Sequence, residues 1–106
     1  VETTILRIPG LLFQENEDNT ISNVYNIKIV NKTHDDMNLE LRLISQDGKI
    51  QMAGNEIKIG DQDRFESTFI LFIPKEKLKS DKTVVEFGIF SNGELIEKYK
   101  ATFVGP

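Results

Sequence analysis

Apolar and polar residues alternate with a period of two through most of this chain, and that alternation constrains the fold more than any other feature. In residues 37–43, Met or Leu stands at every second position, with Asn, Glu or Arg between them. Successive side chains of a β-strand point to opposite faces, so this pattern predicts a strand with one face in a core. A shift of one residue would bury Glu40 and Arg42 without partners, at a cost of several kcal/mol each, so the register is well defined.

The same alternation predicts strands along the rest of the chain. We expect Thr3–Ile8 to be an edge strand, and Val24–Asn31 and Phe65–Ile73 to lie inside a sheet. The other predicted strands are Leu11–Gln14, Met37–Leu43, Lys49–Met52, Glu56–Ile59, Thr83–Ser91 and Glu94–Val104. The two short strands on either side of Gly54-Asn55 are expected at sheet edges.

Glycine and proline mark the predicted turns. Pro9-Gly10 ends the first strand, because proline lacks an N–H for the ladder and glycine permits a kink, and we expect the chain to cross there to the other sheet. Asp47-Gly48 predicts a tight turn, and Asn92-Gly93 predicts a two-residue hairpin because both residues accept a positive φ. Pro74–Asp81 is the one segment in which we expect a helical turn, with Leu78 facing inward.

The predicted core consists of residues on one face of each long strand. They are Tyr25, Ile27, Ile29, Met37, Leu39, Leu41, Leu43, Phe65, Ser67, Phe69, Leu71, Ile73, Val85, Phe87, Ile89, Leu95, Tyr99, Ala101 and Phe103. Many short strands without a long helix predict an all-β fold, an immunoglobulin-like antiparallel β-sandwich of about seven strands that forms a single domain over residues 1–106. The chain has no Cys or Trp, so aliphatic residues and seven Phe must stabilise this core.

Composition argues against several classes of function. The net charge is −4, from 17 acidic and 13 basic side chains, which disfavours binding to a nucleic-acid backbone. Without cysteine, the chain has no disulfide, no thiolate ligand for zinc or an iron-sulfur cluster, and no thiol nucleophile. No apolar run approaches the roughly 18 residues that span a bilayer. Because the chain starts at Val1, we expect it to be a fragment of a larger protein.

His34 is the sole imidazole and the first candidate for catalysis. A triad would pair it with an aspartate and with one of the serines Ser22, Ser45, Ser67, Ser80 and Ser91. These serines lie in or beside predicted strands, no Gly-x-Ser-x-Gly elbow is present, and His34 stands in the turn of residues 32–36. We therefore interpret His34 as a solvated turn residue and assign no catalytic, cofactor-binding or metal-binding residue.

Two acidic loops, residues 15–19 and 61–63, contain carboxylate and amide oxygens that suit calcium. They would form a site only if the fold brought them to the same end, and neither has the spacing of a known calcium loop. Asn31-Lys32-Thr33 matches the glycosylation acceptor pattern. Because that three-residue pattern is common by chance, we interpret it as a turn.

Four lysines, at positions 75, 77, 79 and 82, gather around the predicted helical turn. Such a cluster could meet anionic lipid or an acidic partner. Glu76 and Asp81 stand among the lysines, so a solvated face of mixed charge is the preferred interpretation.

Three segments together resemble a known family. They are Leu6-Arg7-Ile8-Pro9-Gly10 followed by Phe13, then residues 21–33, and finally Thr102-Phe103-Val104-Gly105-Pro106. In this order they resemble the C-terminal immunoglobulin-like domain of the FixG or CcoG family, the cytochrome oxidase accessory proteins. The middle segment, in which Asn-x-Tyr enters a strand that ends in Asn-Lys-Thr, is the most specific part. Between residues 45 and 82 the similarity is one of pattern only.

This resemblance implies a parent protein with several membrane helices and a ferredoxin-like part that holds iron-sulfur clusters. It implies a role in assembly of the cbb-type haem-copper oxidase, by reduction of copper, with the present domain on the periplasmic side of the bacterial inner membrane. The cluster cysteines belong to the absent part, so no family catalytic residue is carried over and no cofactor is expected in this domain. The expected partners are other domains of the parent or oxidase assembly components, and the oligomeric state is left open.

Physical roles for the matched residues can be predicted without assigning a site. We expect the amides of Asn23 and Asn31 to bind backbone groups that the strand ladder leaves unpaired. Tyr25 is expected to be buried, with its hydroxyl at a polar end. The leading hypothesis is a non-catalytic interaction or stabilising module whose edge at Thr3–Ile8 could pair with a partner strand. A generic extracellular or periplasmic adhesion or carbohydrate-binding sandwich is the alternative.

Overall fold

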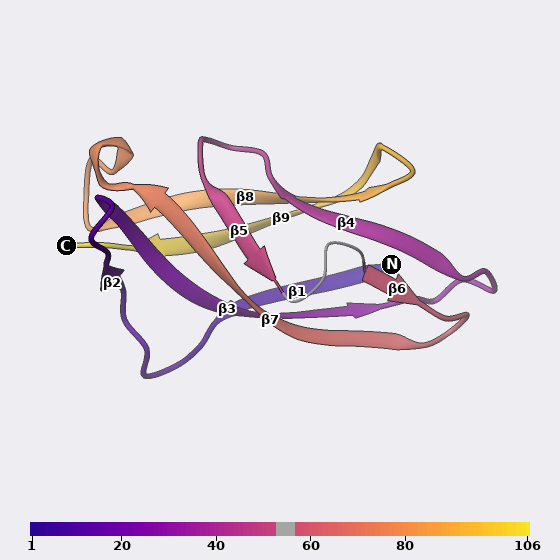
Figure 1. The fold of residues 1–106 in the computed structure, drawn as a ribbon. Helices are drawn as coiled ribbons and strands as arrows, with labels where there is room; N and C mark the ends of the chain where they lie inside the picture. Colours follow the sequence, from indigo (N-terminus) through magenta and orange to yellow (C-terminus); the bar gives the residue numbers. More distant parts are fainter. Residues whose placement is uncertain (53–56) are drawn as a thin grey trace.

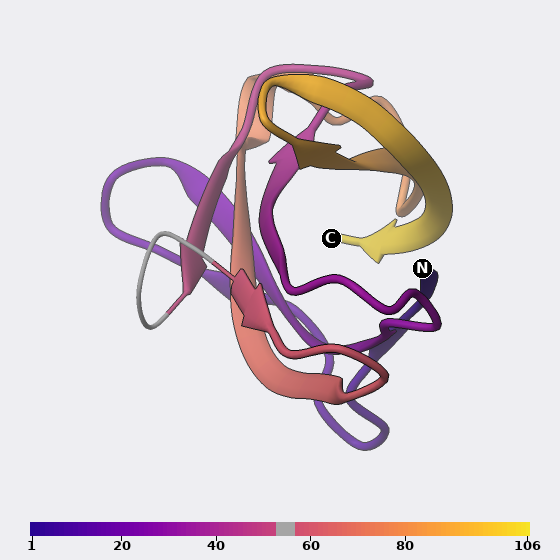
Figure 2. The same ribbon diagram turned by 90° about the vertical axis from the view of Figure 1, so that its right-hand side faces the viewer.

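The computed structural model describes residues 1–52 and 57–106, which form two antiparallel sheets packed face to face (Figure 1). The five-stranded sheet contains, from edge to edge, β1 (Glu2–Arg7), β3 (Thr20–Val30), β7 (Arg64–Pro74) and β5 (Lys49–Met52), with β2 (Gln14–Glu15) paired to β3. The four-stranded sheet contains, in order, β6 (Ile57–Ile59), β4 (Met37–Leu43), β8 (Lys82–Ser91) and β9 (Glu94–Val104). Figure 2 shows both sheets curving around a common core.

The structure confirms the predicted all-β antiparallel sandwich. The described residues contain nine strands, rather than about seven, because the short β2 and β6 also pair. As predicted, β1, β5 and β6 lie at sheet edges, and β3 and β7 lie inside the five-stranded sheet. The two short strands β5 and β6 belong to different sheets. The predicted turn at Gly54-Asn55, together with Glu56, lies outside the described residues.

Three aromatic rings form the centre of the core. Tyr25 on β3, Phe69 on β7 and Phe87 on β8 are each at most 1% exposed. Tyr25 and Phe69 stack with ring centroids 5.3 Å apart, and Phe87 meets both rings edge to face, at 5.7 and 5.4 Å. Both arrangements are favourable for aromatic pairs. Because Phe87 belongs to the opposite sheet, these contacts join the two layers.

The predicted inward faces of β3, β4, β7 and β8 are confirmed. Leu39 is buried, and Leu41 is half-buried against the core. The central strand β3 begins at Thr20 rather than at Val24, because its inward face continues through Ile21 and Asn23, both fully buried. A polar residue therefore occupies a core position, and it interrupts the apolar pattern that the prediction follows.

The predicted crossing to the other sheet at Pro9-Gly10 is wrong. Gly10 has a φ of 83°, and the Leu11 N–H donates to the Ile8 carbonyl at 3.3 Å, which is the geometry of a type II turn. The chain stays beside the five-stranded sheet, where β2 pairs with β3. The predicted strand Leu11–Gln14 is accordingly a loop up to Phe13.

The predicted hairpin at Asn92-Gly93 is confirmed, with a positive φ at both residues. Leu95, however, is 37% exposed and lies outside the core. A bulge shifts the register between Ile89 and Phe90, so that Leu95 pairs with Phe90, the neighbour of the buried Ile89. The extra residue reverses the alternation at the start of β9. Only the later predicted positions pack against the core, namely Tyr99, Ala101 and Phe103.

The one helical turn of the described residues is the 3-10 helix η1 (Lys75–Lys77), which connects β7 to β8 and so leads from one sheet to the other. Pro74 precedes it as the N-cap residue. Leu78, directly after it, is half-buried against the core as predicted. Within residues 1–52 and 57–106, no helix is both long and apolar enough to cross a membrane.

Candidate interaction surface

The structure does not assemble a catalytic set around His34. The imidazole is exposed, and its Nδ1 lies 3.0 Å from Nε2 of Gln62, in a hydrogen bond that joins two loops. Ser22 lies near the start of β3, whereas His34 follows the end of that strand. Ser45 is engaged elsewhere, since its hydroxyl accepts the Glu86 N–H at 2.9 Å. In the described part of the chain, His34 therefore acts as a loop residue without a serine partner.

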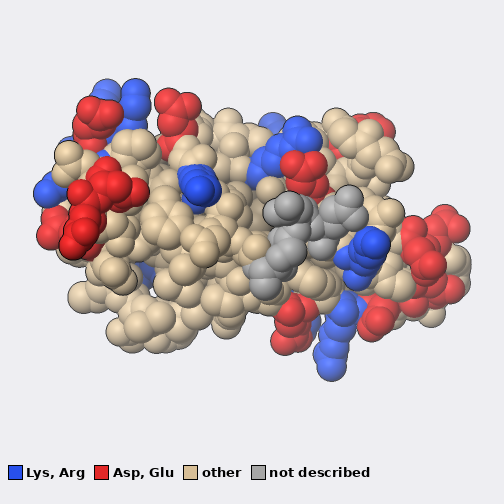
Figure 3. Space-filling model, viewed as in Figure 1, with Lys and Arg blue, Asp and Glu red and all other residues tan. Residues whose placement is uncertain are grey.

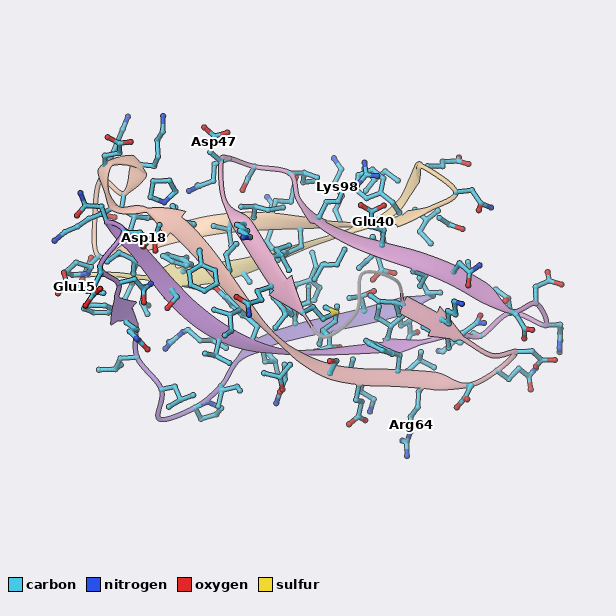
Figure 4. The ribbon with its side chains drawn as sticks, in the orientation of Figure 1. Glu15, Asp18, Glu40, Asp47, Arg64 and Lys98 are labelled. Carbon is cyan, nitrogen blue, oxygen red and sulfur yellow. The ribbon has the colours of Figure 1, made fainter. Side chains whose placement is uncertain are left out.

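The two acidic loops lie at opposite ends of the sandwich. Residues 15–19 precede β3, whereas residues 61–63 precede the start of β7, which pairs with the end of β3. At about 3.4 Å per residue, the 11 residues of β3 separate the loops by roughly 35 Å. Figure 4 shows Glu15 and Asp18 at one end and Arg64, which follows the second loop, toward the other. A calcium site built from both loops is therefore ruled out, and no group of three metal-binding side chains occurs among the described residues.

The side-chain amide of Asn31 is fully used for hydrogen bonding. The residue is 1% exposed, and its Nδ2 donates to the carbonyls of Asp35 and Gly60 at 2.8 and 3.0 Å. Its Oδ1 accepts the N–H and the hydroxyl of Thr33 at 3.0 and 2.7 Å. This confirms the predicted role for Asn31, which joins the loop after β3 to the loop before β7. Both amide hydrogens are engaged, which disfavours a glycan at this position.

The lysines around η1 belong to a surface of mixed charge. Lys75 Nζ lies 3.1 Å from Glu15 Oε1, and Lys77 Nζ lies 4.0 Å from Asp47 Oδ2. Basic and acidic side chains are interleaved at this corner in Figure 3, at the upper left. Exposed pairs of this kind contribute about 0–1 kcal/mol each. The arrangement supports the interpretation of this cluster as a solvated face.

Two side chains of β3 reach across the core and bind the backbone of β9; we call Asn23 and Tyr25 the β9 clasp. The Asn23 Nδ2 donates to the Val104 carbonyl at 2.9 Å, and its Oδ1 accepts the Val104 N–H at 2.9 Å. The Tyr25 hydroxyl donates to the Thr102 carbonyl at 2.8 Å. Both clasp residues are fully buried. The predicted burial of Tyr25 and the predicted backbone-binding role of Asn23 are thus confirmed.

The environment of Tyr25 favours the neutral phenol that the clasp needs as a donor. Burial raises the pKa of Tyr25 above its usual value of 10.0, and this effect outweighs the opposite influence of the Arg7 charge. The Tyr25 hydroxyl therefore keeps its proton near neutral pH and can donate its hydrogen bond there.

The edge of β1 is partly covered by β9. Glu97 Oε1, from β9, accepts the N–H of Thr3 at 2.7 Å. That N–H belongs to the strand that we expected to offer an open edge to a partner. Because one of its backbone donors is already bound inside the domain, β1 is a poorer site for strand addition than the alternation suggests.

An exposed apolar loop is the strongest candidate for an interaction surface. We call residues 8–13, between β1 and β2, the leucine loop. Leu12 is 72% exposed, Leu11 is 47% exposed, and Leu6, near the end of β1, is 61% exposed. Complete burial of a leucine side chain contributes about 1.5–3 kcal/mol. Folding of the domain therefore leaves more than half of that stabilisation unrealised at Leu12 and Leu6, and about half of it at Leu11.

Hydrogen bonds hold the leucine loop in position. In addition to the type II turn at Pro9-Gly10, the Ile8 N–H donates to the Val24 carbonyl at 3.0 Å. Arg7 Nη1 donates to the Leu11 carbonyl at 3.2 Å. Phe13 is half-buried against the core. The loop is therefore anchored at both ends, and its two leucines stay exposed between the anchors.

A groove of about 350 Å³ lies between the leucine loop and the outer face of the five-stranded sheet. Its polar lining consists of amide and hydroxyl side chains. Its apolar lining is Leu11, Leu12, Phe13, Val24, Ile70 and Phe72. None of the lining residues is charged, although 28% of the chain is. Figure 3 shows the corresponding uncharged area at the lower left.

The sequence interpretation missed this surface because it assigned Leu11–Gln14 to a strand. A usable signal was present. Leu11 and Leu12 are adjacent, and on a strand one of two adjacent residues must face away from the core. Two neighbouring leucines after a Pro-Gly turn therefore indicate an exposed apolar site.

Comparison with known proteins places the chain in a family. The family model described as "IG-like fold at C-terminal of FixG, putative oxidoreductase" matches residues 1–106, the whole chain. The chain belongs to the FixG C-terminal domain family. The resemblance drawn from the three sequence segments is thereby confirmed.

The fold of this FixG C-terminal domain is shared with a solved structure. The crystal structure of a FixG-related protein from Vibrio parahaemolyticus matches with a TM-score of 0.78 at 19% sequence identity, over 97% of this chain and 94% of that chain. At this level of identity the likeness shows a common fold. No curated protein matches the chain.

The β9 clasp makes a prediction for stability. Asn23→Ala leaves the partly buried N–H and C=O of Val104 without the fully buried amide that binds both, and should lower the free energy of unfolding by about 2–4 kcal/mol. Asn26→Ala is the matched control, because Asn26 lies on the same strand but is exposed on its outer face. Urea unfolding measures both losses, and hydrogen exchange reports on the Val104 amide. Equal losses for the two variants would contradict the role of Asn23.

The pKa of Tyr25 makes a prediction for alkaline pH. A phenol whose folded-state pKa lies above its unfolded value of 10.0 contributes stability that is fully present below pH 10.0 and is lost as the pH rises above it. The wild-type domain should therefore lose stability above that pH, and Tyr25→Phe should show a smaller loss over the same range. Urea midpoints measured against pH test this. Parallel curves for the two proteins would argue against the buried phenol as the cause.

Proposed function

We propose that this domain is a non-catalytic interaction and stabilising module on the periplasmic side of the bacterial inner membrane. Its parent would be a membrane-bound iron-sulfur protein that assists assembly of the cbb-type cytochrome oxidase and the handling of copper. The observation that carries the proposal is the match of the FixG C-terminal family over residues 1–106. The described side chains support it, because they offer an apolar surface and no assembled catalytic set.

The domain's own residues do not suit the redox chemistry proposed for the parent. Iron-sulfur clusters are held by cysteine thiolates, and copper(I) prefers Cys, Met and His. The chain has no Cys, one His and two Met. His34 is hydrogen-bonded to Gln62, and Met37 and Met52 are partly buried against the core. We infer that clusters and copper are handled elsewhere in the parent, and that this domain acts through contacts.

The structure suggests how such a module would meet its partners. The β9 clasp and the Glu97–Thr3 contact satisfy backbone groups at the edges of β9 and β1. Edge pairing is thereby disfavoured on that side of the sandwich. The outer face of the five-stranded sheet, with the leucine loop, is left as the surface best suited to other domains of the parent or to oxidase assembly components.

The periplasmic location can be tested by cysteine labelling of the full-length parent. Asp47 has a side chain that is 83% exposed, and the domain itself has no cysteine. Asp47→Cys should react with a membrane-impermeant maleimide in intact spheroplasts. Val85→Cys, at a fully buried position, is the control and should react only after denaturation. Reaction of Asp47→Cys only after lysis would contradict the periplasmic location.

The role in oxidase assembly can be tested by deleting residues 1–106 from the parent. We expect the amount of assembled cbb-type oxidase in the membrane to fall several-fold, while the electron paramagnetic resonance signals of the parent's iron-sulfur clusters persist, because the deleted part holds none. Normal oxidase levels would contradict the proposal. Specific binding of a glycan by the isolated domain would favour the adhesion or carbohydrate-binding alternative.

A further inference from the structure

The charge around the leucine loop indicates the kind of partner that suits it. From Thr3 to Gln14 the only charged residue is Arg7, in a chain in which 17 acidic side chains outnumber 13 basic ones. The next acidic residue, Glu15, pairs with Lys75 at 3.1 Å. An anionic surface that approaches residues 8–13 therefore meets one cation and no carboxylate of this stretch. Beside Leu6 the outer face of the sheet adds Lys28 and Glu66, one charge of each sign.

The position of the leucines favours a fluid apolar partner. The loop projects from the body of the sandwich in Figure 1, between β1 and β2. Leu12 and Leu11 of the loop are 72% and 47% exposed, and Leu6, near the end of β1, is 61% exposed. A protein partner would need a cavity whose shape matches this loop. The boundary between lipid headgroups and acyl chains is fluid, so it can bury exposed apolar side chains of any shape.

Arg7 places a cation directly beside this apolar tip. Its guanidinium donates to the Leu11 carbonyl at 3.2 Å, so the positive charge lies at the base of the leucine loop. Leu6 and Arg7 are neighbours on β1, and their side chains leave the strand on opposite faces. Lipid bilayers present the complementary arrangement, with phosphate oxygens above hydrocarbon. Guanidinium groups bind phosphate well, and long basic side chains adapt to the interface. Only the leucine side chains need to enter the hydrocarbon, while the loop backbone stays in the hydrated headgroup layer.

We propose that the leucine loop docks on a phospholipid bilayer that contains anionic lipid. Leu6, Leu11 and Leu12 insert at the acyl boundary, and Arg7 contacts lipid phosphate. This docking goes beyond the proposed function and is separable from it, because a periplasmic domain can assist oxidase assembly without touching lipid. Docking would set the orientation of the sandwich relative to the membrane surface and turn the four-stranded sheet away from it.

The test is binding of the chain to vesicles of phosphatidylethanolamine and phosphatidylglycerol, measured by co-sedimentation at millimolar lipid. The variant with both Leu11→Ser and Leu12→Ser should partition at least about tenfold less well, since it loses two apolar insertions. Removing phosphatidylglycerol should weaken wild-type binding several-fold. The substituted side chains are exposed, so urea unfolding should show an unchanged midpoint and establish that the variant is folded.

Two matched controls separate this surface from others. Val84→Ser removes a side chain that is 66% exposed on the other sheet, and it should leave partitioning unchanged. Lys77→Glu with Lys79→Glu should also leave it nearly unchanged if the leucine loop, rather than the lysine cluster, carries the contact.

Four results would overturn the proposal. They are absence of wild-type binding, equal binding by the double leucine variant, loss of binding only in the lysine variant, and a concentration-dependent dimer that the leucine substitutions dissociate. The last result would assign the loop to a second copy of the chain. None of these results bears on the labelling of Asp47→Cys, so failure here is distinguishable from failure of the proposed function.

Discussion

The contact between β3 and β9 is the interaction on which the rest of the sandwich depends. Among the described strands, the edge strand β9 pairs with β8 alone, so one side of its backbone needs partners from elsewhere. Asn23 and Tyr25 supply them from the opposite sheet, and the Tyr25 ring also packs on Phe69 and Phe87. Apolar burial by itself has no preferred direction. The hydrogen bonds therefore define one position of the sheets relative to each other.

This arrangement also decides which surfaces remain open. With Glu97 on the Thr3 N–H and the β9 clasp on Thr102 and Val104, the side of the sandwich between β1 and β9 is engaged in internal contacts. The outer face of the five-stranded sheet differs, because an uncharged groove and three exposed leucines lie there. A domain without a catalytic set among its described residues would act through such a face, and the leucine loop is the feature of it that folding does not explain.

The fold and the family together describe a scaffold, and a sandwich supports many unrelated tasks. In this sandwich, the side chains that could carry chemistry lie apart from one another. The acidic loops lie at opposite ends, His34 is bound to Gln62, and the lysines around η1 alternate with carboxylates. The charged groups of the described residues do not gather into a site, whereas three of the seven exposed large apolar residues, Leu6, Leu11 and Leu12, lie in or beside the leucine loop.

The sequence by itself determined the β-sandwich, the inward faces of its long strands and the hairpin at Asn92-Gly93, because period-two alternation and turn chemistry are local properties. Only the tertiary structure decided that Asn23 belongs to the core. Its partner Val104 lies 81 residues away, and in the sequence a polar residue with so distant a partner cannot be told from one that faces water. The tertiary structure also decided the exposure of Leu95, through a bulge, and of Leu11 and Leu12, through a turn that returns the chain to the same sheet. Strand pairing between distant segments sets these features, and a local pattern does not encode which segments pair.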